Sequence, residues 1–313
     1  MAIQSKITPM LHRRSFMVAS AAAAIAPDFA RAQSPVPDQL DWGRMTRADR
    51  DLAYNNGAAV PDSAQIMERI IAASTNLRAQ RSKHIDVSYG EGARNKWDLF
   101  PGDNSRAPCL VHIHGGNWQT RSREHFSCLA EGVLARGWSA ALPGYTLAPD
   151  ATLTQITREI RNALDWLAAH GSAHGVAGPI IVSGWSAGGH LATLALDHPS
   201  IKAGLAISAT YELGPFRDTY LNTALKLTDE EIATLSPLRL RGVDKPLAIS
   251  YGTAELPAYV RNSREYHAYR ARSHLPGPLI PVIKANHFTM LEELRSPKGL
   301  LTRAAISLAD EIA

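Results

Sequence analysis

The stretch PIIVSGWSAGGHLATLAL (residues 179–196) passes from an apolar strand through a glycine-rich turn into a helix. Its centre, GWSAG, is a G-x-S-x-G motif in a strand–turn–helix context. The turn exposes a serine side chain at the carboxyl end of a strand, and its glycines are needed because a Cβ there would collide with the neighbouring chain. The N-terminus of the following helix attracts developing negative charge. The pattern therefore predicts Ser186 as a nucleophile and the Ala187 N–H as a donor to an oxyanion.

Short apolar runs alternate with helical patterns on both sides of this motif. Such alternation predicts an α/β fold with a mainly parallel central sheet flanked by helices. We expect a hairpin from 84–89 and 96–100, further strands at 108–114, 138–145, 179–184, 203–208, 246–252 and 279–285, and helices at 123–136, 154–169 and 258–273.

The chain of 313 residues is expected to hold one catalytic domain. We assign residues 81–313 to this domain, and residues 33–80 to a helical segment that precedes it and covers the pocket. Residues 211–240 contain prolines and an acidic run that interrupt the strand–helix rhythm. We therefore expect this stretch to be a small cap insertion.

The sequence HGGNW (114–118) ends an earlier apolar strand. An oxyanion hole needs backbone N–H groups that can approach the substrate closely, and this requirement favours glycine. We expect Gly116 and Asn117 to donate these N–H groups, while Gly115 shapes the turn. We expect His114 to order the loop through a hydrogen bond.

A serine nucleophile needs a base and a third group that orients the base. The last predicted strand runs into NHFTMLEEL (286–294), which places His287 in a loop at a strand's carboxyl end. The preceding strand is followed by YGTAEL, and Glu255 is the first carboxylate after it. The order serine, acid, histidine fits a catalytic triad of Ser186, Glu255 and His287.

His112 and His114 lie two residues apart on a strand and so share a face, as metal ligands can. No third ligand has convincing spacing, so we expect no metal site and no cofactor. The two cysteines, Cys109 and Cys128, either form a disulfide or are small buried residues.

Aromatic residues stand beside the predicted site motifs. They either line an aromatic substrate pocket or pack in the core, and the sequence leaves both readings open. These residues are Trp118, Tyr145, Trp185 and Phe288.

The first 32 residues have the features of an export signal. The pair Arg13-Arg14 precedes an apolar run (16–26) that is too short to span a bilayer but has the length of a signal-peptide core. The small-x-small sequence ARA then ends at Ala32, where we expect cleavage. The arginine pair resembles a twin-arginine signal, which implies the twin-arginine export machinery as a partner and a periplasmic or secreted enzyme.

This leader carries most of the chain's net charge of +4, with Lys6, Arg13, Arg14 and Arg31 against Asp28. The basic balance therefore does not indicate a nucleic-acid partner, and no cluster of basic residues elsewhere suggests one. The composition, 45% hydrophobic and 20% charged, is that of an ordinary globular protein, and we expect no stable membrane span.

Several of these motifs resemble the arylformamidase (kynurenine formamidase) branch of the α/β-hydrolases and, more broadly, the HGGG-type esterases. The resemblance covers about residues 80–295, and in one of its stretches an Asp stands where this chain has Glu255. It implies an α/β-hydrolase fold and the hydrolysis of an aryl formamide or a small carboxylic ester without a cofactor. The matching stretches are HGGNW (114–118), 145–167, VSGWSAGGHLA (182–192), 227–238, YGTAELPAYVRNS (251–263) and NHFTMLEEL (286–294).

We therefore predict an exported serine hydrolase that cleaves a small-molecule ester or amide through an acyl-enzyme. One alternative is a cytosolic kynurenine formamidase of tryptophan breakdown. An alternative of another class is a non-catalytic binding protein built on a hydrolase fold.

Overall fold

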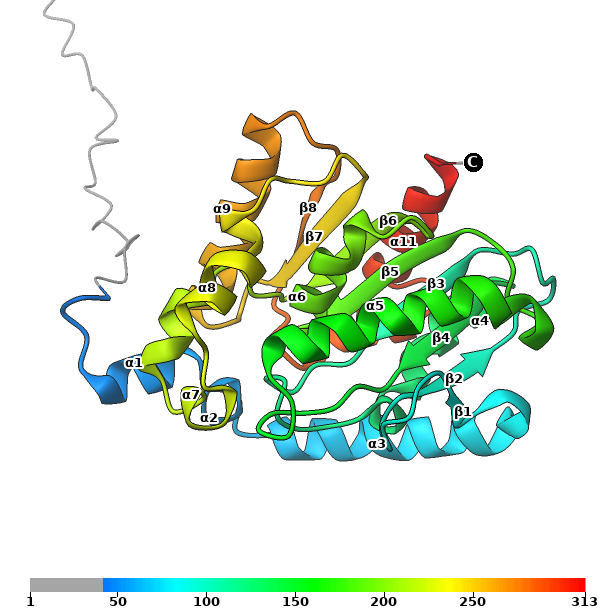
Figure 1. Ribbon diagram of the computed structural model, residues 1–313, viewed down its shortest axis with the longest axis horizontal. Coiled ribbons are helices and arrows are strands. Elements are labelled where there is room, and N and C mark those ends of the chain that lie inside the picture. The colour runs from blue at the N-terminus through cyan, green and yellow to red at the C-terminus, as the bar shows by residue number, and fades with distance from the viewer. Residues whose placement is uncertain (1–41, 313) are drawn as a thin grey trace, which may run out of the picture. The chain divides into compact units, whose positions relative to one another are not determined.

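The computed structural model describes residues 42–312, and an eight-stranded sheet lies at the centre of this part of the chain (Figure 1). The strand order is β1-β2-β4-β3-β5-β6-β7-β8. The strands are β1 (Val87–Ser88), β2 (Lys96–Phe100), β3 (Cys109–Ile113), β4 (Ser139–Pro143), β5 (Ile180–Trp185), β6 (Ile201–Ile207), β7 (Leu247–Gly252) and β8 (Leu279–Val282).

The sheet is parallel except at one edge. β2 pairs antiparallel with β1 and β4, and every other neighbouring pair is parallel. Every residue of β3, β5 and β7 is buried, as expected for parallel strands covered on both faces. The predicted α/β class and mainly parallel sheet are therefore confirmed, and the predicted hairpin is present with a shorter first strand.

Helices cover both faces of the sheet because successive strand residues point to opposite sides. Val111 and Val182 pack in one core with residues of α5, α6 and α9, whereas Leu110 and Ile181 pack in a second core with residues of α3, α10 and α11. The α-helices are α1 (Arg47–Ala53), α2 (Asn56–Ala59), α3 (Ser63–Gln80), α4 (Glu131–Leu134), α5 (Leu153–His170), α6 (Ala187–Leu194), α7 (Asn222–Leu225), α8 (Asp229–Leu235), α9 (Pro257–Arg272), α10 (Glu292–Arg295) and α11 (Leu300–Asp310).

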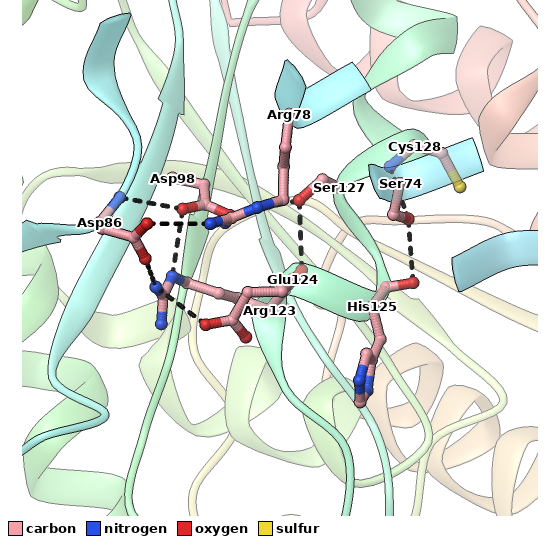
Figure 2. Close-up of polar contacts among 9 residues, drawn as sticks. All are labelled: Ser74, Arg78, Asp86, Asp98, Arg123, Glu124, His125, Ser127 and Cys128. Carbon is pink, nitrogen blue, oxygen red and sulfur yellow. Dashed lines mark hydrogen bonds and ion pairs between the residues drawn. The ribbon is translucent and has the colours of Figure 1, made fainter. Parts of the chain in front are cut away.

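The expected helix at 123–136 is not continuous. The chain there forms two 3₁₀ turns before the short helix α4. The reason is hydrogen bonding to α3: the Cys128 N–H donates to Ser74 Oγ (3.1 Å), and the Ser74 hydroxyl donates to the His125 carbonyl (2.9 Å; Figure 2). A side chain of α3 thus takes a backbone donor that an α-helix would use itself.

A charged cluster, Arg78, Asp86, Asp98 and Arg123, lies where α3, β2 and the first of these turns meet (Figure 2). The Asp98 carboxylate on β2 accepts from Arg123 Nε (3.2 Å) and is paired with Arg78. The Asp86 carboxylate pairs with the same two guanidinium groups, at 3.0 Å from Arg78 Nη2. The cluster ties segments that are distant in sequence to one another.

The segment before α3 packs on residues 211–240, which contain α7, α8 and 3₁₀ turns. Trp42 Nε1 donates to Asp218 Oδ2 (3.0 Å), and the Tyr54 ring lies 4.3 Å from the Phe216 ring. α3 itself packs in the second core, so only the part of the helical segment before α3 lies against this insertion.

The predicted leader, residues 1–32, lies outside the described residues. So do the expected cleavage site and the first residues of the 33–80 segment. Within residues 42–312, no helix combines the length and the apolar character that crossing a membrane requires.

Candidate active site

Ser186 occupies a sharp turn between β5 and α6. Its backbone has φ 56° and ψ −122°, a conformation that costs energy for a residue with a side chain. A Cβ on Gly184 would lie 2.1 Å from the Gly188 carbonyl oxygen, and one on Gly188 would lie 2.0 Å from the Ile113 oxygen. The turn can therefore form only with glycine at both positions, and the Ser186 N–H anchors it by donating to the Ile207 carbonyl (2.8 Å).

The loop after β3 lies directly against this turn. A Cβ on Gly115 would be 3.1 Å from Ser186 Cβ, and the next two residues, Gly116 and Asn117, have φ of 119° and 54°. Among residues 42–312, the N–H groups of Gly116 and Asn117 donate to no protein acceptor. The same holds for Ala187, whose N–H at the start of α6 has no partner within the helix. The structure thus places Gly115 and Ala187 next to Ser186, with Gly116 and Asn117 following Gly115 in the same loop.

His114 and Tyr145 support this loop from the core side. Burial lowers the pKa of His114 to about 3, so the ring is neutral, and its Nδ1–H donates to the Gly115 carbonyl (2.8 Å). The Tyr145 hydroxyl donates to the His114 carbonyl (2.8 Å), and the two rings stack at 4.2 Å. Tyr145 is fully buried, so it packs beneath the loop.

Glu255 and His287 form a buried hydrogen-bonded pair. His287 Nδ1 lies 2.7 Å from Glu255 Oε1, and the Gly252 N–H donates to Glu255 Oε2 (3.0 Å). The carboxylate side chain is fully buried and the imidazole is 4% exposed. Because Nδ1–H donates its hydrogen bond to the carboxylate, the unprotonated Nε2 is the nitrogen that can act as a base.

Two of the aromatic residues that were candidates for a pocket hold the histidine loop. Trp185 Nε1 donates to the His287 carbonyl (2.8 Å), and its ring lies 4.9 Å from the imidazole. Phe288 packs against both rings. Trp118 is buried against Phe216 of the insertion. All of these side chains, like Tyr145, are at most 7% exposed.

Tyr259 lies against the site, although the sequence analysis did not single it out. The Tyr259 ring lies 4.7 Å from the His287 ring, and the side chain is 1% exposed. Within residues 42–312, no hydrogen bond joins Ser186 to His287, whose Nδ1 is held by Glu255. The position of Tyr259, one helical turn after Glu255, was a signal that could have found it.

Both cysteines are free and buried. Burial raises the pKa of the Cys109 thiol to about 12 and that of Cys128 to about 11. The sequence left open a disulfide or two small buried residues. The structure shows that each cysteine is a small buried residue.

His112 and His114 are buried beneath the site. Burial lowers the pKa of each ring to about 3. Across the described part of the chain, no group of three or more His, Cys, Asp or Glu side chains is arranged to hold a metal ion.

The sequence is similar to several hydrolases. The model of the BD-FAE family matches residues 99–200. Kynurenine formamidase of Danio rerio is 26% identical over 86% of this chain and 98% of its own length. The "Probable carboxylic ester hydrolase LipM" of Mycobacterium tuberculosis is 30% identical over 58% of this chain and 44% of its own length.

The fold is also that of known hydrolase structures. A crystal structure from a Silicibacter species, assigned as a thioesterase, superposes with a TM-score of 0.73 and is 29% identical, covering 82% of this chain and 98% of that one. The chain has the α/β-hydrolase fold. Esterase B of Lactobacillus rhamnosis, at 17% identity, has the same fold, with a TM-score of 0.62 over 80% of this chain and 98% of its own.

Proposed function

We propose that this chain is a serine hydrolase that cleaves a carboxylic ester or an aryl amide or formamide through an acyl-enzyme. The observation that carries the proposal is the buried hydrogen bond of 2.7 Å between His287 Nδ1 and Glu255 Oε1, at the strand ends beside the strained turn of Ser186. A hydrogen-bonded acid and base next to a serine in such a turn is the arrangement that activates a hydroxyl.

In acylation, Ser186 Oγ attacks the carbonyl carbon while His287 Nε2 takes the hydroxyl proton. Glu255 holds the imidazole and stabilises the imidazolium that forms. The N–H groups of Gly116, Asn117 and Ala187 bind the oxyanion. The tetrahedral intermediate then collapses, the bond to the leaving group breaks, and His287 returns the proton to the leaving atom.

Deacylation repeats these steps with water as the nucleophile. His287 takes a proton from water, the hydroxide adds to the acyl carbon, and the Ser186 oxygen leaves with the proton that His287 gives back. The carboxylic acid is released and the free serine is restored. No cofactor takes part in this sequence of steps.

The kinetic test is the Ser186→Ala variant, assayed with N-formylkynurenine and with short p-nitrophenyl esters. We expect kcat to fall by roughly 10⁴ or more for every substrate that the wild-type protein cleaves. The melting temperature and circular dichroism spectrum should remain those of the wild type, because the substitution removes one hydroxyl. Hydrolysis by this variant at a near-normal rate would disprove the assignment.

A second candidate is a cytosolic kynurenine formamidase, favoured by the similarity to the Danio rerio enzyme over 86% of this chain. The two candidates differ in their substrate and in their cellular location. Cleavage of N-formylkynurenine far above p-nitrophenyl esters, by protein recovered from the cytosol, would favour the second.

We further propose export through the twin-arginine machinery, supported by the sequence of residues 1–32. The test expresses the full chain in a bacterial host and sequences the N-terminus of the protein from each fraction. Export predicts periplasmic protein that begins near Gln33, and an Arg13→Lys/Arg14→Lys variant that stays in the cytosol. Full-length wild-type protein confined to the cytosol would contradict it.

A further inference from the structure

The loop that supplies the proposed oxyanion donors has a strained backbone. Asn117, Trp118 and Arg121 have φ of 54°, 59° and 73°, in the left-handed region that costs energy for a residue with a side chain. Such a conformation persists only where the surrounding structure holds it. The directions of the Gly116 and Asn117 N–H groups therefore depend on the contacts that hold this loop.

Contacts from other segments fix the middle of the loop. The Trp118 carbonyl accepts a hydrogen bond from the Ala148 N–H (2.8 Å). The Gln119 side-chain amide donates to the Leu221 carbonyl (2.9 Å). These contacts leave the end of the loop to another group.

The guanidinium of Arg94 joins the end of the loop to its beginning. Arg94 Nη2 donates to the Arg121 carbonyl (2.6 Å), and Arg94 Nε donates to the Tyr145 carbonyl (2.7 Å). The Tyr145 hydroxyl in turn donates to the carbonyl of His114, where the loop begins (2.8 Å). One side chain thus sets the distance between the two ends of the loop.

The backbone of Arg94 is itself held in place. Arg94 is partly buried in the turn before β2, and its carbonyl oxygen would lie 2.4 Å from a Cβ on Gly144. The Gly144 N–H donates to the Lys96 carbonyl (2.8 Å), which joins the same two segments. Because a guanidinium is planar and presents its donors in a rigid fork, Arg94 can reach both carbonyls at once.

We propose, on the basis of the function proposed above, that Arg94 is a positioning residue whose guanidinium holds the oxyanion loop in the shape that aims the Gly116 and Asn117 N–H groups at the oxyanion. Oxyanion donors bind more strongly in the transition state than in the ground state, so Arg94 raises kcat and leaves KM almost unchanged. The cluster of Asp98 differs, because it holds the side chain of Arg123, which lies beyond the loop.

The test replaces Arg94 by methionine, which keeps much of the apolar stem and removes both donors. The substrate is N-formylkynurenine or p-nitrophenyl acetate, whichever the wild type cleaves faster. We expect kcat to fall about tenfold to a hundredfold, since a displacement of about 1 Å in an active site has an effect of this size. KM should stay within about threefold of the wild-type value.

A trifluoromethyl ketone with the acyl group of that substrate reports on the oxyanion loop directly. Ser186 adds to its carbonyl and forms a tetrahedral oxyanion that resembles the transition state. The inhibition constant for Arg94→Met should rise by the same factor as kcat falls.

Arg270→Met is the matched control, because Arg270 donates to the carbonyls of Lys245 (2.8 Å) and Pro276 (2.9 Å) before β7 and β8, at the opposite ends of the strands from Ser186. Its folded fraction should keep kcat within about threefold of the wild type. Arg94→Lys and Arg270→Lys repeat the comparison with the charge kept. They test the proposal where a methionine variant does not fold, with a smaller loss of kcat expected for Arg94→Lys.

The proposal is overturned if Arg94→Met keeps kcat within about threefold of the wild type, or if only KM changes. It is also overturned if the ketone binds the variant and the wild type equally, or if the Arg270 variants lose as much kcat. Failure of the proposed function is distinguishable. The wild type would then cleave neither substrate, whereas each of these outcomes leaves wild-type turnover intact.

Discussion

Two buried carboxylates among the described residues, Asp98 and Glu255, are used differently. Asp98, in the charged cluster, is paired with Arg78 and Arg123 and also accepts from the Ser127 hydroxyl (3.2 Å). Among residues 42–312, Glu255 accepts only from His287 and from one backbone N–H. Both carboxylates are fully buried.

The partners explain the difference. Guanidinium groups stay charged at any working pH, so the Asp98 cluster is a permanent clamp between α3, β2 and the turn that follows the oxyanion loop. An imidazole gains and loses a proton near neutrality, and His287 Nε2 has no hydrogen-bond partner among the described residues. A saturated network fixes structure, whereas a pair with one unbonded nitrogen can do chemistry.

The largest expected effect comes from Glu255→Gln. The amide keeps the size of the carboxylate, but it presents an N–H to His287 Nδ1 and so favours the wrong tautomer of the ring. We expect kcat to fall by about 10⁴, as for loss of the orienting acid in other triads. The urea midpoint should stay close to that of the wild type. A variant with more than a tenth of normal turnover would show that another group orients His287.

The opposite pattern is expected from Asp98→Ala. This change removes the fully buried one of the two carboxylates that Arg78 and Arg123 share and leaves them the partly exposed Asp86, so the free energy of unfolding should fall by about 3 kcal/mol. The protein that remains folded should keep kcat within about threefold, because the cluster contacts none of the triad residues. Asp98→Asn, which keeps the shape, is the control for lost volume. Loss of turnover without loss of stability would break the comparison.

The smallest expected effect is the pH dependence of stability that comes from buried histidines outside the proposed triad. Burial lowers the pKa of His112 and His114 to about 3 and that of His190 to about 4, against 6.5 for an exposed ring. Between these lowered pKa values and pH 6.5, the unfolded chain therefore binds more protons than the folded protein does. The contribution of each neutral ring to the free energy of unfolding is complete above pH 6.5. It falls as the pH drops toward 4, by about 1.4 kcal/mol per pH unit for each ring.

Urea unfolding at pH 7.5, 6 and 5 measures this dependence. His190→Gln keeps an N–H donor for the Leu235 carbonyl, which His190 Nε2 contacts at 2.7 Å, but cannot titrate. The variant should lose stability less steeply on acidification than the wild type. Identical slopes for the two proteins would mean that His190 does not bind its proton on unfolding.

The sequence predicted those parts of the fold and site that rest on local patterns. Strands were readable as short apolar runs, and Ser186 and Gly116 stood out because the turns around them require glycine. The order of strands, each followed by a polar loop, was enough to select Glu255 and His287. These assignments needed only the neighbours of each residue in the chain.

Contacts between distant segments could not be predicted. Tyr54, in the chain before α3, meets Phe216 and Tyr259 only after that chain has folded against them. The prediction of a continuous helix at 123–136 was wrong for a similar reason. Ser74 on α3 accepts a hydrogen bond from a backbone N–H of that segment. The sequence identified the four aromatic residues beside the site motifs. It could not show whether their side chains pack in the core or contact the substrate.

The central claim is that Ser186 is the nucleophile of an acyl-enzyme mechanism. Its most direct test is reaction of the mature wild-type protein with a fluorophosphonate, followed by intact-mass and peptide mass spectrometry. The account predicts one phosphonyl adduct per chain on the peptide that contains Ser186, and no adduct on the Ser186→Ala protein. An unlabelled wild-type protein, or an adduct on a different serine such as Ser183 or Ser250, would contradict it.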